Sequence, residues 1–495
     1  MGVVFRQSVK TTIVTSLGAA LGLLIVYLSA HYIPKQELGC SRNLLYQAVI
    51  GTQFVLIGMQ STLYIFIPRY PVHDKRRQLL FALGLITPFI LTALLSVFYF
   101  LFKEQIIASY QAQDTVLLTK YFAWLPLYTL LWSLITLLEQ YLSAQMKVAV
   151  STFVREIILR IINIVLIMLY AYSQIDFNQF IIWGVCVHII PVIIMFVLAA
   201  KTEGFGMSLN FKLMTRGEYK SIFDFAFFHL FLNITIGLLT YIDAVMLGAL
   251  DRSGLQAVAV YFIAQSIISI YIIPFRSLAA ASAPAINKAY HEENTHEVHD
   301  LFMRSSINTL IVTIFMAVLI ICNLQNAVLI LGDNYSTVKP VVMILMIGRT
   351  FDMMTGLNNE VISLSKYYRY NFYLSGILLA LVIIMNWLLI PHWGIYGAAW
   401  SSAIALFLFN LFKWAFLWNK MKLQPFSQNT LKVLFCGAAV IVVGFYLPYI
   451  YNPYIDTFVR SLVILILYAV IILFIHPSDD LKGYLLSVKK NKRLF

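Results

Sequence analysis

The chain has 495 residues, of which 61% are hydrophobic and only 12% are charged, and its mean hydropathy is +0.83. No water-soluble core absorbs so much apolar surface, so the composition excludes a soluble globular domain and predicts an integral membrane protein. The formal net charge of +13 does not indicate a nucleic-acid partner, because the basic residues fall in short loops beside apolar stretches rather than on one aromatic-interleaved surface.

Apolar stretches recur along nearly the whole chain. Many are about 20 residues long, which as helix is enough to cross roughly 30 Å of hydrocarbon. Strand-like alternation of apolar and polar residues is absent, so a barrel is disfavoured. We therefore predict an all-α polytopic membrane protein with about 14 transmembrane helices.

The first six predicted spans form an N-terminal bundle, and a long polar interruption follows them. These spans are residues 10–33, 43–67, 79–102, 115–142, 150–171 and 177–200. The predicted bundle occupies residues 1–203, and the interruption at residues 204–221 is interpreted as a cytoplasmic linker.

Six further spans form a second bundle at residues 222–420. They are residues 222–249, 255–283, 303–325, 337–364, 370–390 and 394–419. Two more spans, 429–451 and 454–475, and a basic tail make up residues 421–495.

The two bundles are interpreted as pseudo-repeats. Gly39 precedes Tyr46 by seven residues at the start of the second span, and Gly254 precedes Tyr261 by seven at the start of the eighth. Parallel repeats of this kind place a cavity between two bundles.

Lysine and arginine are concentrated in loops that fall on one side of the membrane, such as residues 69–78 and 201–220. By the positive-inside rule this side is the cytoplasm, and both termini are expected there. The four cysteines stand far apart and indicate neither disulfides nor a metal site. Phosphate-binding loops and catalytic motifs are absent, so we expect neither an enzyme nor a cofactor.

Three segments resemble a known superfamily. They are "DAVMLGAL…GLQAVAVY" at residues 243–261, "NWLLIPHWGIYGAAWSS" at 386–402 and the amphipathic opening at 2–24. Together they are similar to the multidrug/oligosaccharidyl-lipid/polysaccharide exporter superfamily, and within it to the polysaccharide flippases. In the second segment, the Ile-Pro at 390–391 is expected to end a helix.

The resemblance implies a flippase that moves undecaprenyl-diphosphate-linked oligosaccharide across the bacterial inner membrane by alternating access, for surface polysaccharide synthesis. The lipid-linked oligosaccharide and the lipid bilayer would then be its partners, with the polysaccharide polymerase and chain-length machinery as further candidates. Helices 429–451 and 454–475 are expected to form part of a groove for the lipid tail.

Four bases are assigned to the interior of spans, where charge is costly: Arg160, Arg276, Arg349 and Lys413. The resemblance implies that intramembrane arginines bind the diphosphate, and guanidinium suits paired phosphate oxygens. We expect Arg276 first, then Arg349 and Arg160, to bind it. Lys413 is interpreted as an interfacial lysine.

Further charged residues complete the prediction. Arg6 and Lys10 are expected to lie at the cytoplasmic entrance of the cavity between the bundles. The alternative for each base is pairing with a carboxylate, and for Arg349 the i+3 spacing favours Asp352.

Four carboxylates are candidates for binding the H⁺ or Na⁺ that would be coupled to transport: Asp243, Asp352, Glu139 and Glu360. For Asp243 we favour a structural hydrogen bond at the helix junction, in which it caps the next helix or pairs with Arg252. Glu139 and Glu360 lie near helix ends, where a solvated carboxylate costs little.

Two alternatives stay open. One is a cation-coupled multidrug exporter of the same superfamily, although such exporters usually have twelve helices and favour acidic cavities. The other is a membrane glycan polymerase or ligase, which the short outer loops disfavour.

Overall fold

The computed structural model describes residues 2–292, 295–365, 367–478 and 480. All regular elements in these residues are helical. The chain divides into two compact units, Met1–Phe262 and Ile263–Phe495. The predicted basic tail at 489–495 lies outside the described residues.

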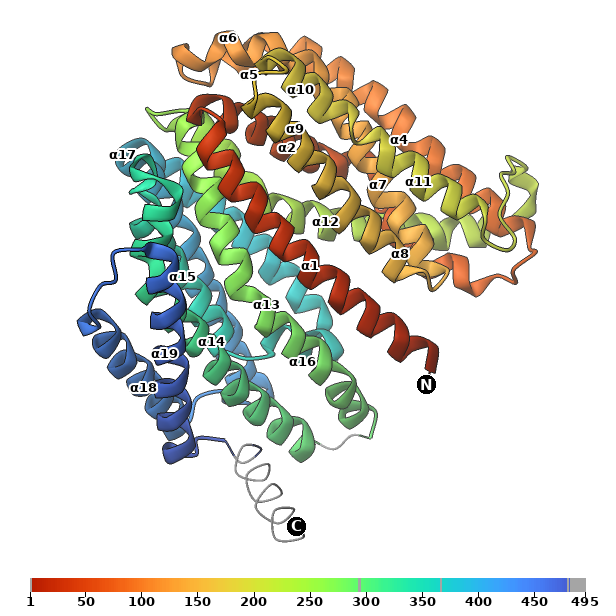
Figure 1. Cartoon of the computed structure of the whole chain (residues 1–495). Helices are drawn as coiled ribbons and strands as arrows, with labels where there is room; N and C mark the ends of the chain where they lie inside the picture. The colour runs from red at the N-terminus through yellow and green to blue at the C-terminus, as the bar shows by residue number, and fades with distance from the viewer. Residues whose placement is uncertain (1, 293–294, 366, 479, 481–495) are drawn as a thin grey trace. The chain divides into compact units, whose positions relative to one another are not determined.

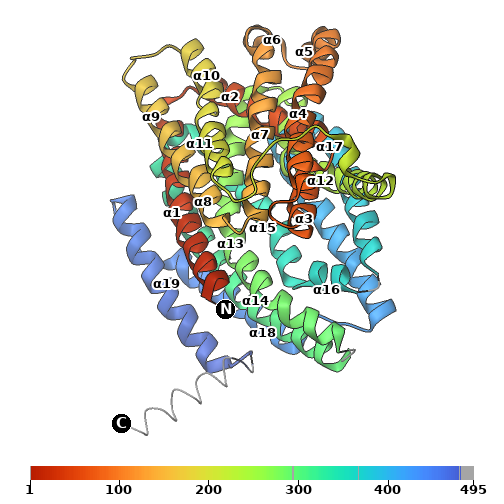
Figure 2. The same ribbon diagram turned by 90° about the vertical axis from the view of Figure 1, so that its right-hand side faces the viewer.

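Unit 1 contains helices α1 to α12 and the start of α13, most of them labelled in Figure 1 and α3 in Figure 2. They are α1 (Gly2–Tyr32), α2 (Lys35–Leu56), α3 (Met59–Phe66), η1 (Ile67–Arg69), α4 (Lys75–Leu101), α5 (Lys103–Ala108), α6 (Ala112–Tyr121), η2 (Phe122–Trp124), α7 (Leu125–Ala144), α8 (Val148–Phe153), η3 (Val154–Ile158), α9 (Leu159–Ala171), α10 (Phe177–Cys186), α11 (Ile189–Ala200), η4 (Phe211–Leu213), α12 (Arg216–Leu250) and α13 (Leu255–His291).

Unit 2 contains the rest of α13 and the helices that follow it. They are α14 (Thr295–Leu331), η5 (Asp333–Tyr335), α15 (Val338–Met354), α16 (Asn358–Leu364), α17 (Tyr368–Phe416), η6 (Leu417–Met421), α18 (Gln428–Tyr446) and α19 (Pro453–Ile475).

Ten helices among the described residues are long and apolar enough to cross a membrane, or eleven if α2 and α3 with η1 form one span bent by 57°. Three features account for the difference from the expected fourteen. The α8 to α9 stretch is interrupted by a π-helix, α15 has only 17 residues, and α17 counts once although it contains a break. The expectation of an all-helical polytopic membrane protein is confirmed.

The break in α17 lies at Gly394, whose φ of 55° and ψ of −133° are not helical. A side chain would be strained there, and a Cβ at Gly397 would lie 2.3 Å from the Leu389 carbonyl oxygen. The helical backbone therefore runs through Pro391 and turns three residues later than the expected stop at 390–391. The two halves match the predicted spans 370–390 and 394–419.

Unit 1 has a core in which α4, α7 and α11 lie side by side (Figure 2). Buried leucines such as Leu79, Leu80 and Leu138 fill the space between these helices. Helix α12, which was expected to open the second bundle, packs on α2 and α3 and belongs to unit 1. The arrangement as two six-helix repeats, with boundaries at 203, 221 and 420, stays a prediction.

The basic loop at residues 69–78 is held against the start of α12. Arg76 donates to Asp74 Oδ2 at 2.6 Å and to Glu218 Oε1 at 2.9 Å. The hydrogen bonds from the Arg76 side chain hold the pKa of Asp74 below its usual value. The interruption at 204–221 is thus an ordered segment anchored at its end.

Unit 2 has a core built where α14 meets α18 and α19 (Figure 1). Ile314, Val318, Val440 and Ile464 are buried in this contact. Helices α15 and α16 pack separately on α17. This second contact carries most of the polar side chains of unit 2 described below.

Candidate functional site

The predicted site residues divide between the two units. Unit 1 contains five of them: Arg6, Lys10, Glu139, Arg160 and Asp243. Lys10 is exposed, and the side chain of Arg6 is not among those that the structure describes. Arg276, Arg349, Asp352 and Glu360 lie in unit 2. Each unit brings some of them into a polar cluster.

In unit 1, Glu139 and Arg160 belong to one chain of ion pairs. Glu139 Oε2 accepts from Arg155 Nη1 at 2.7 Å, and Arg155 Nε donates to Glu156 Oε1 at 3.2 Å. Glu156 Oε2 in turn lies 2.5 Å from Arg160 Nη2. Two arginines and two glutamates thus neutralise one another. Arg155 and Glu156 were not among the predicted site residues.

The same chain ties α1 to this cluster. Arg160 Nη1 donates to the Gly18 carbonyl oxygen, and a Cβ at Gly22 would lie 2.5 Å from that nitrogen. The absence of side chains at Gly18 and Gly22 on α1 therefore leaves room for the Arg160 guanidinium between α1 and α9. Arg155 and Glu156 lie in the π-helix η3, a type of helix that often occurs at functional sites.

Asp243 has a structural hydrogen bond near the junction of α12 and α13. It is 4% exposed and accepts from the Tyr261 hydroxyl at 3.0 Å. The cap of α13 comes from Asp114 instead, whose Oδ2 accepts from the Leu255 amide at 2.9 Å. The Tyr261 contact is of the structural kind expected for Asp243, and a cap on the next helix or a pairing with Arg252 stays a prediction.

In unit 2, polar side chains gather where α15 ends and α16 begins. Arg349 Nη1 lies 3.7 Å from Asp352 Oδ2, the pairing that their spacing favours. Asp352 Oδ1 accepts from Asn410 Nδ2 at 2.9 Å, and Asn410 Oδ1 accepts from Asn358 at 2.9 Å and from Thr355 at 3.2 Å. A carboxylate of α15 is thus joined to α17 by amide groups.

Lys413 continues this cluster one turn further along α17. It is only 2% exposed, and its Nζ donates to Asn359 Oδ1 at 2.6 Å. The interpretation as an interfacial lysine is wrong, because the ammonium is buried inside unit 2. The neighbouring Glu360 has a buried Oε2 without a hydrogen-bond partner among the described residues.

Neither Arg276 nor Arg42 has a hydrogen bond or ion pair with any described residue. Arg276 on α13 is exposed. Arg42 on α2 is partly buried, its Nε has no partner, and its guanidinium carbon lies 4.0 Å from the centroid of the Phe262 ring. The sequence prediction missed Arg42 because its span was started at residue 43.

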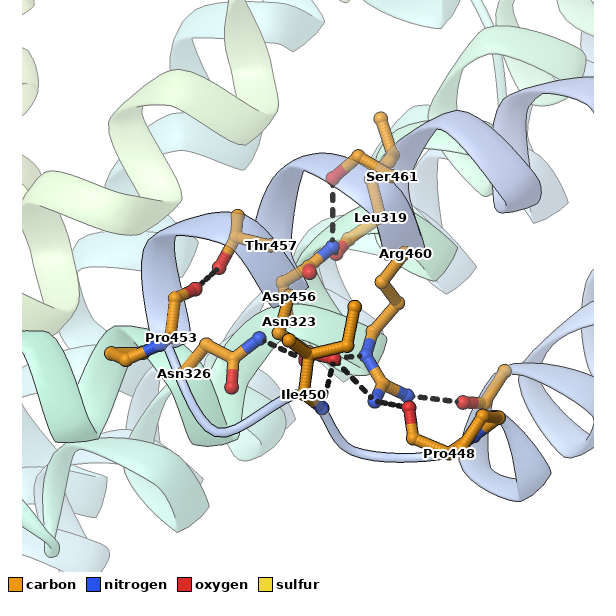
Figure 3. A network of polar contacts seen from close by, with 11 residues as sticks. Leu319, Asn323, Asn326, Pro448, Ile450, Pro453, Asp456, Thr457, Arg460 and Ser461 are labelled. Atoms are coloured by element: carbon orange, nitrogen blue, oxygen red, sulfur yellow. Dashed lines mark hydrogen bonds and ion pairs between the residues drawn. The ribbon is translucent and has the colours of Figure 1, made fainter.

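A third unpredicted arginine, Arg460, has the opposite character (Figure 3). Its guanidinium donates to Asp456 Oδ2 at 3.0 Å and to the Gly444 carbonyl at 2.6 Å, and Asp456 also accepts from Asn326 at 2.6 Å. Both members of the pair are buried. This network holds the turn between α18 and α19 on α14 and leaves its charges satisfied.

Metal ligands do not gather anywhere in the described part of the chain: no group of three or more His, Cys, Asp or Glu side chains is placed to hold a metal ion. The polar clusters are instead mixtures of arginine, lysine, carboxylate and amide. Such sites suit anions, protons or single monovalent cations.

Comparison with known proteins gives the fold. The MatE family matches residues 229–388. A lipid II flippase MurJ in an inward closed conformation aligns with a TM-score of 0.73 at 13% identity, over 94% of this chain and 98% of its own. The chain has the fold of MOP superfamily transporters.

Multidrug transporters of the same superfamily align less completely. An inward-facing MATE transporter of the MOP superfamily gives a TM-score of 0.64 at 13% identity, over 82% of this chain and 94% of its own. An outward-facing one gives 0.55 at 15%, over 85% and 95%. No curated protein matches the sequence. The matched structures are those of a lipid flippase and of multidrug transporters.

Proposed function

We propose that the protein is a flippase for undecaprenyl-diphosphate-linked oligosaccharide in the bacterial inner membrane, working by alternating access with both termini in the cytoplasm. The observation that carries the proposal is that Arg42 in unit 1 and Arg276 in unit 2, each inside a helix, have no anionic partner among the described residues. A guanidinium in a membrane-spanning helix is costly unless it has a partner, and a diphosphate supplies paired oxygens in the right geometry.

The remaining predicted arginines have a weaker claim. Arg160 is already bound to Glu156 and to the Gly18 carbonyl, and Arg349 is loosely paired with Asp352. Arg6 and Lys10 remain candidates for the cytoplasmic entrance of the cavity. We therefore place Arg276 and Arg42 first as diphosphate ligands and keep Arg349 and Arg160 behind them.

The lipid tail has a candidate site on α18 and α19. An open, apolar groove of about 560 Å³ lies between them, lined by Lys432, Phe435, Cys436, Ala439, Ile471 and Ile475. A polyprenyl chain suits such a surface, because it buries apolar area without requiring hydrogen bonds. Crosslinks to the sugar alone, with none between the tail and these helices, would count against this site.

Binding of the headgroup tests the proposal directly. The purified chain in nanodiscs is titrated with undecaprenyl diphosphate and with undecaprenol, which lacks the phosphates. We expect tight binding of the diphosphate only, and weakening by Arg42→Ala and Arg276→Ala. Equal affinity for both lipids, or unchanged affinity in both variants, would contradict the role of the arginines.

The second candidate is a cation-coupled multidrug exporter, which the likeness to MATE transporters favours. An exporter of cationic drugs would have to accept positive charge beside Arg42 and Arg276. Efflux of a lipophilic cationic dye from cells that overproduce the protein, set against cells with an empty vector, separates the two candidates.

A further inference from the structure

One buried cation has no part in the proposed binding of diphosphate. Lys413 donates to Asn359 Oδ1 at 2.6 Å, and its Nζ lies 4.0 Å from the centroid of the Phe409 ring. Its contacts among the described residues include no carboxylate oxygen within ion-pair distance, so the ammonium is held by a neutral amide and an aromatic face.

The charged groups around Lys413 come from the two helices packed on α17. Asp352 on α15 is joined to α17 through Asn410, and Glu360 on α16 directly follows Asn359, the partner of Lys413. Arg349, also on α15, is occupied by Asp352 at 3.7 Å. On the following element, η6, Lys420 is exposed. The cluster thus sets two carboxylates against one buried ammonium and one guanidinium.

The oxygen atoms in this cluster are of the kind that bind a hard cation. Carboxylate oxygens of Asp352 and Glu360 and amide oxygens of Asn359 and Asn410 all belong to it, and the Glu360 Oε2 is buried and unpartnered. The Lys413 ammonium, which is part of the chain itself, supplies the positive charge in this cluster. Unlike arginine, lysine readily gives up its proton when it is buried.

We propose that Lys413 takes the place of a free metal cation in the Asp352 and Glu360 cluster and exchanges a proton there, so that this site is coupled to H⁺ and not to Na⁺. Its part in transport rests on the proposed function, whereas the occupancy of the cluster does not. When Lys413 loses its proton, the proton leaves to water and Arg349 is the positive charge that still faces the two carboxylates. That change alters the electrostatic interactions that hold α15 and α16 on α17.

The first test measures the thermal unfolding midpoint of the purified full chain in nanodiscs, with NaCl replacing choline chloride at constant ionic strength. A cation that binds only the folded state raises the midpoint with its concentration. We expect no saturable rise in wild type or in the control Lys420→Ala. In Lys413→Ala we expect a saturable rise, which adding Asp352→Asn and Glu360→Gln removes. A saturable rise in wild type, or none in a folded Lys413→Ala, would overturn the proposal.

The second test does not depend on the folding of Lys413→Ala. Proton release between pH 7 and pH 9 is measured in weakly buffered solution for wild type and Lys413→Arg. Because arginine does not deprotonate in proteins, wild type should release about one proton more per molecule. Equal release would refute proton exchange at Lys413. Neither test uses a lipid-linked substrate, so failure of the flippase proposal and failure of this one are distinguishable.

Discussion

Arginine side chains inside the helices have two different surroundings, and this difference separates structural from functional candidates. Arg160 and Arg460 each bind a carboxylate and a backbone carbonyl, so their charges are already compensated. Arg42 and Arg276 have neither among the described residues. Residue type alone does not reveal this, because the partner lies on another helix or is lacking.

Arg276→Ala should lower the rate of flipping by roughly 10- to 100-fold, the loss expected when one charge-assisted contact to the substrate is removed. The measurement is the amount of precursor that reaches the outer leaflet at equal protein abundance. Arg304→Ala is the matched control, because Arg304 on α14 is exposed and paired with Asp300. Normal flipping by Arg276→Ala would remove this residue from the site.

Glu156→Gln should destabilise the protein, because it leaves Arg160 with only the Gly18 carbonyl and removes one of the two carboxylates on Arg155. The expected loss is about 1–3 kcal/mol, discounted for the partial exposure of both arginines. Thermal unfolding in nanodiscs measures it. The control Glu104→Gln, at an exposed position, should unfold like wild type. An unchanged midpoint for Glu156→Gln would show that the ion-pair chain carries no stability.

Spacing along the sequence predicted side-chain contacts within one helix, but it missed contacts between side chains on different helices. The i+3 spacing of Arg349 and Asp352 gave their pairing. Nothing in the spacing joins Glu139 to Arg155, which are 16 residues apart, or Asp114 to Leu255, which are 141 apart. Arg42 was missed for a smaller reason, a span boundary placed one residue too late.

Among the helices, the α18 and α19 hairpin has the most specific attachment. The buried pair of Asp456 and Arg460 joins the turn to Asn326 on α14 (Figure 3), and the apolar contact below it is filled by Val318 and Val440. The hairpin is therefore a docked part of unit 2.

Arg460→Met should destabilise the chain by about 3–5 kcal/mol, because it leaves the Asp456 carboxylate buried without its cation. The double variant Asp456→Asn with Arg460→Met should lose less than Arg460→Met alone, since no unpaired charge remains. Thermal unfolding of the two variants and wild type decides the order. A double variant less stable than Arg460→Met would contradict this account of the pair.

Asp114→Ala should loosen the start of α13, because the Leu255 amide and Gln36 both lose their acceptor. We expect a loss of about 1–2 kcal/mol, typical of a removed helix cap. Hydrogen exchange at residues 255–259 should rise in the variant and stay at the wild-type level in Asp176→Ala, because Asp176 caps another helix, α10. Unchanged exchange at α13 would refute the capping role.

The spans themselves were largely predictable, because lipid requires long apolar helices and their lengths follow from the bilayer thickness. Interruptions were harder to place. The π-helix at Val154–Ile158 has no sequence signal of its own, and the turn in α17 occurs at Gly394 although Pro391 suggested an earlier stop. A proline is tolerated in a membrane helix when neighbouring groups satisfy the backbone.

At the scale of the whole molecule, composition alone required a multi-pass helical membrane protein, and the comparisons place that protein in the MOP fold. Substrate is a different matter. Transporters of one fold carry unlike cargo, so cargo has to be argued from charge and shape at particular residues. Our proposal of an anionic substrate rests on Arg42 and Arg276, which have no anionic partner among the described residues.

The leaflet distribution of undecaprenyl-diphosphate-linked oligosaccharide in cells depleted of this protein tests the central claim most directly. A glycan-cleaving reagent is added from the periplasmic side, and the cleaved fraction is compared with that in replete cells. A flippase predicts that precursor accumulates protected from the reagent, and that wild-type protein but not Arg276→Ala restores cleavage. Precursor that reaches the outer leaflet normally without the protein would contradict the claim.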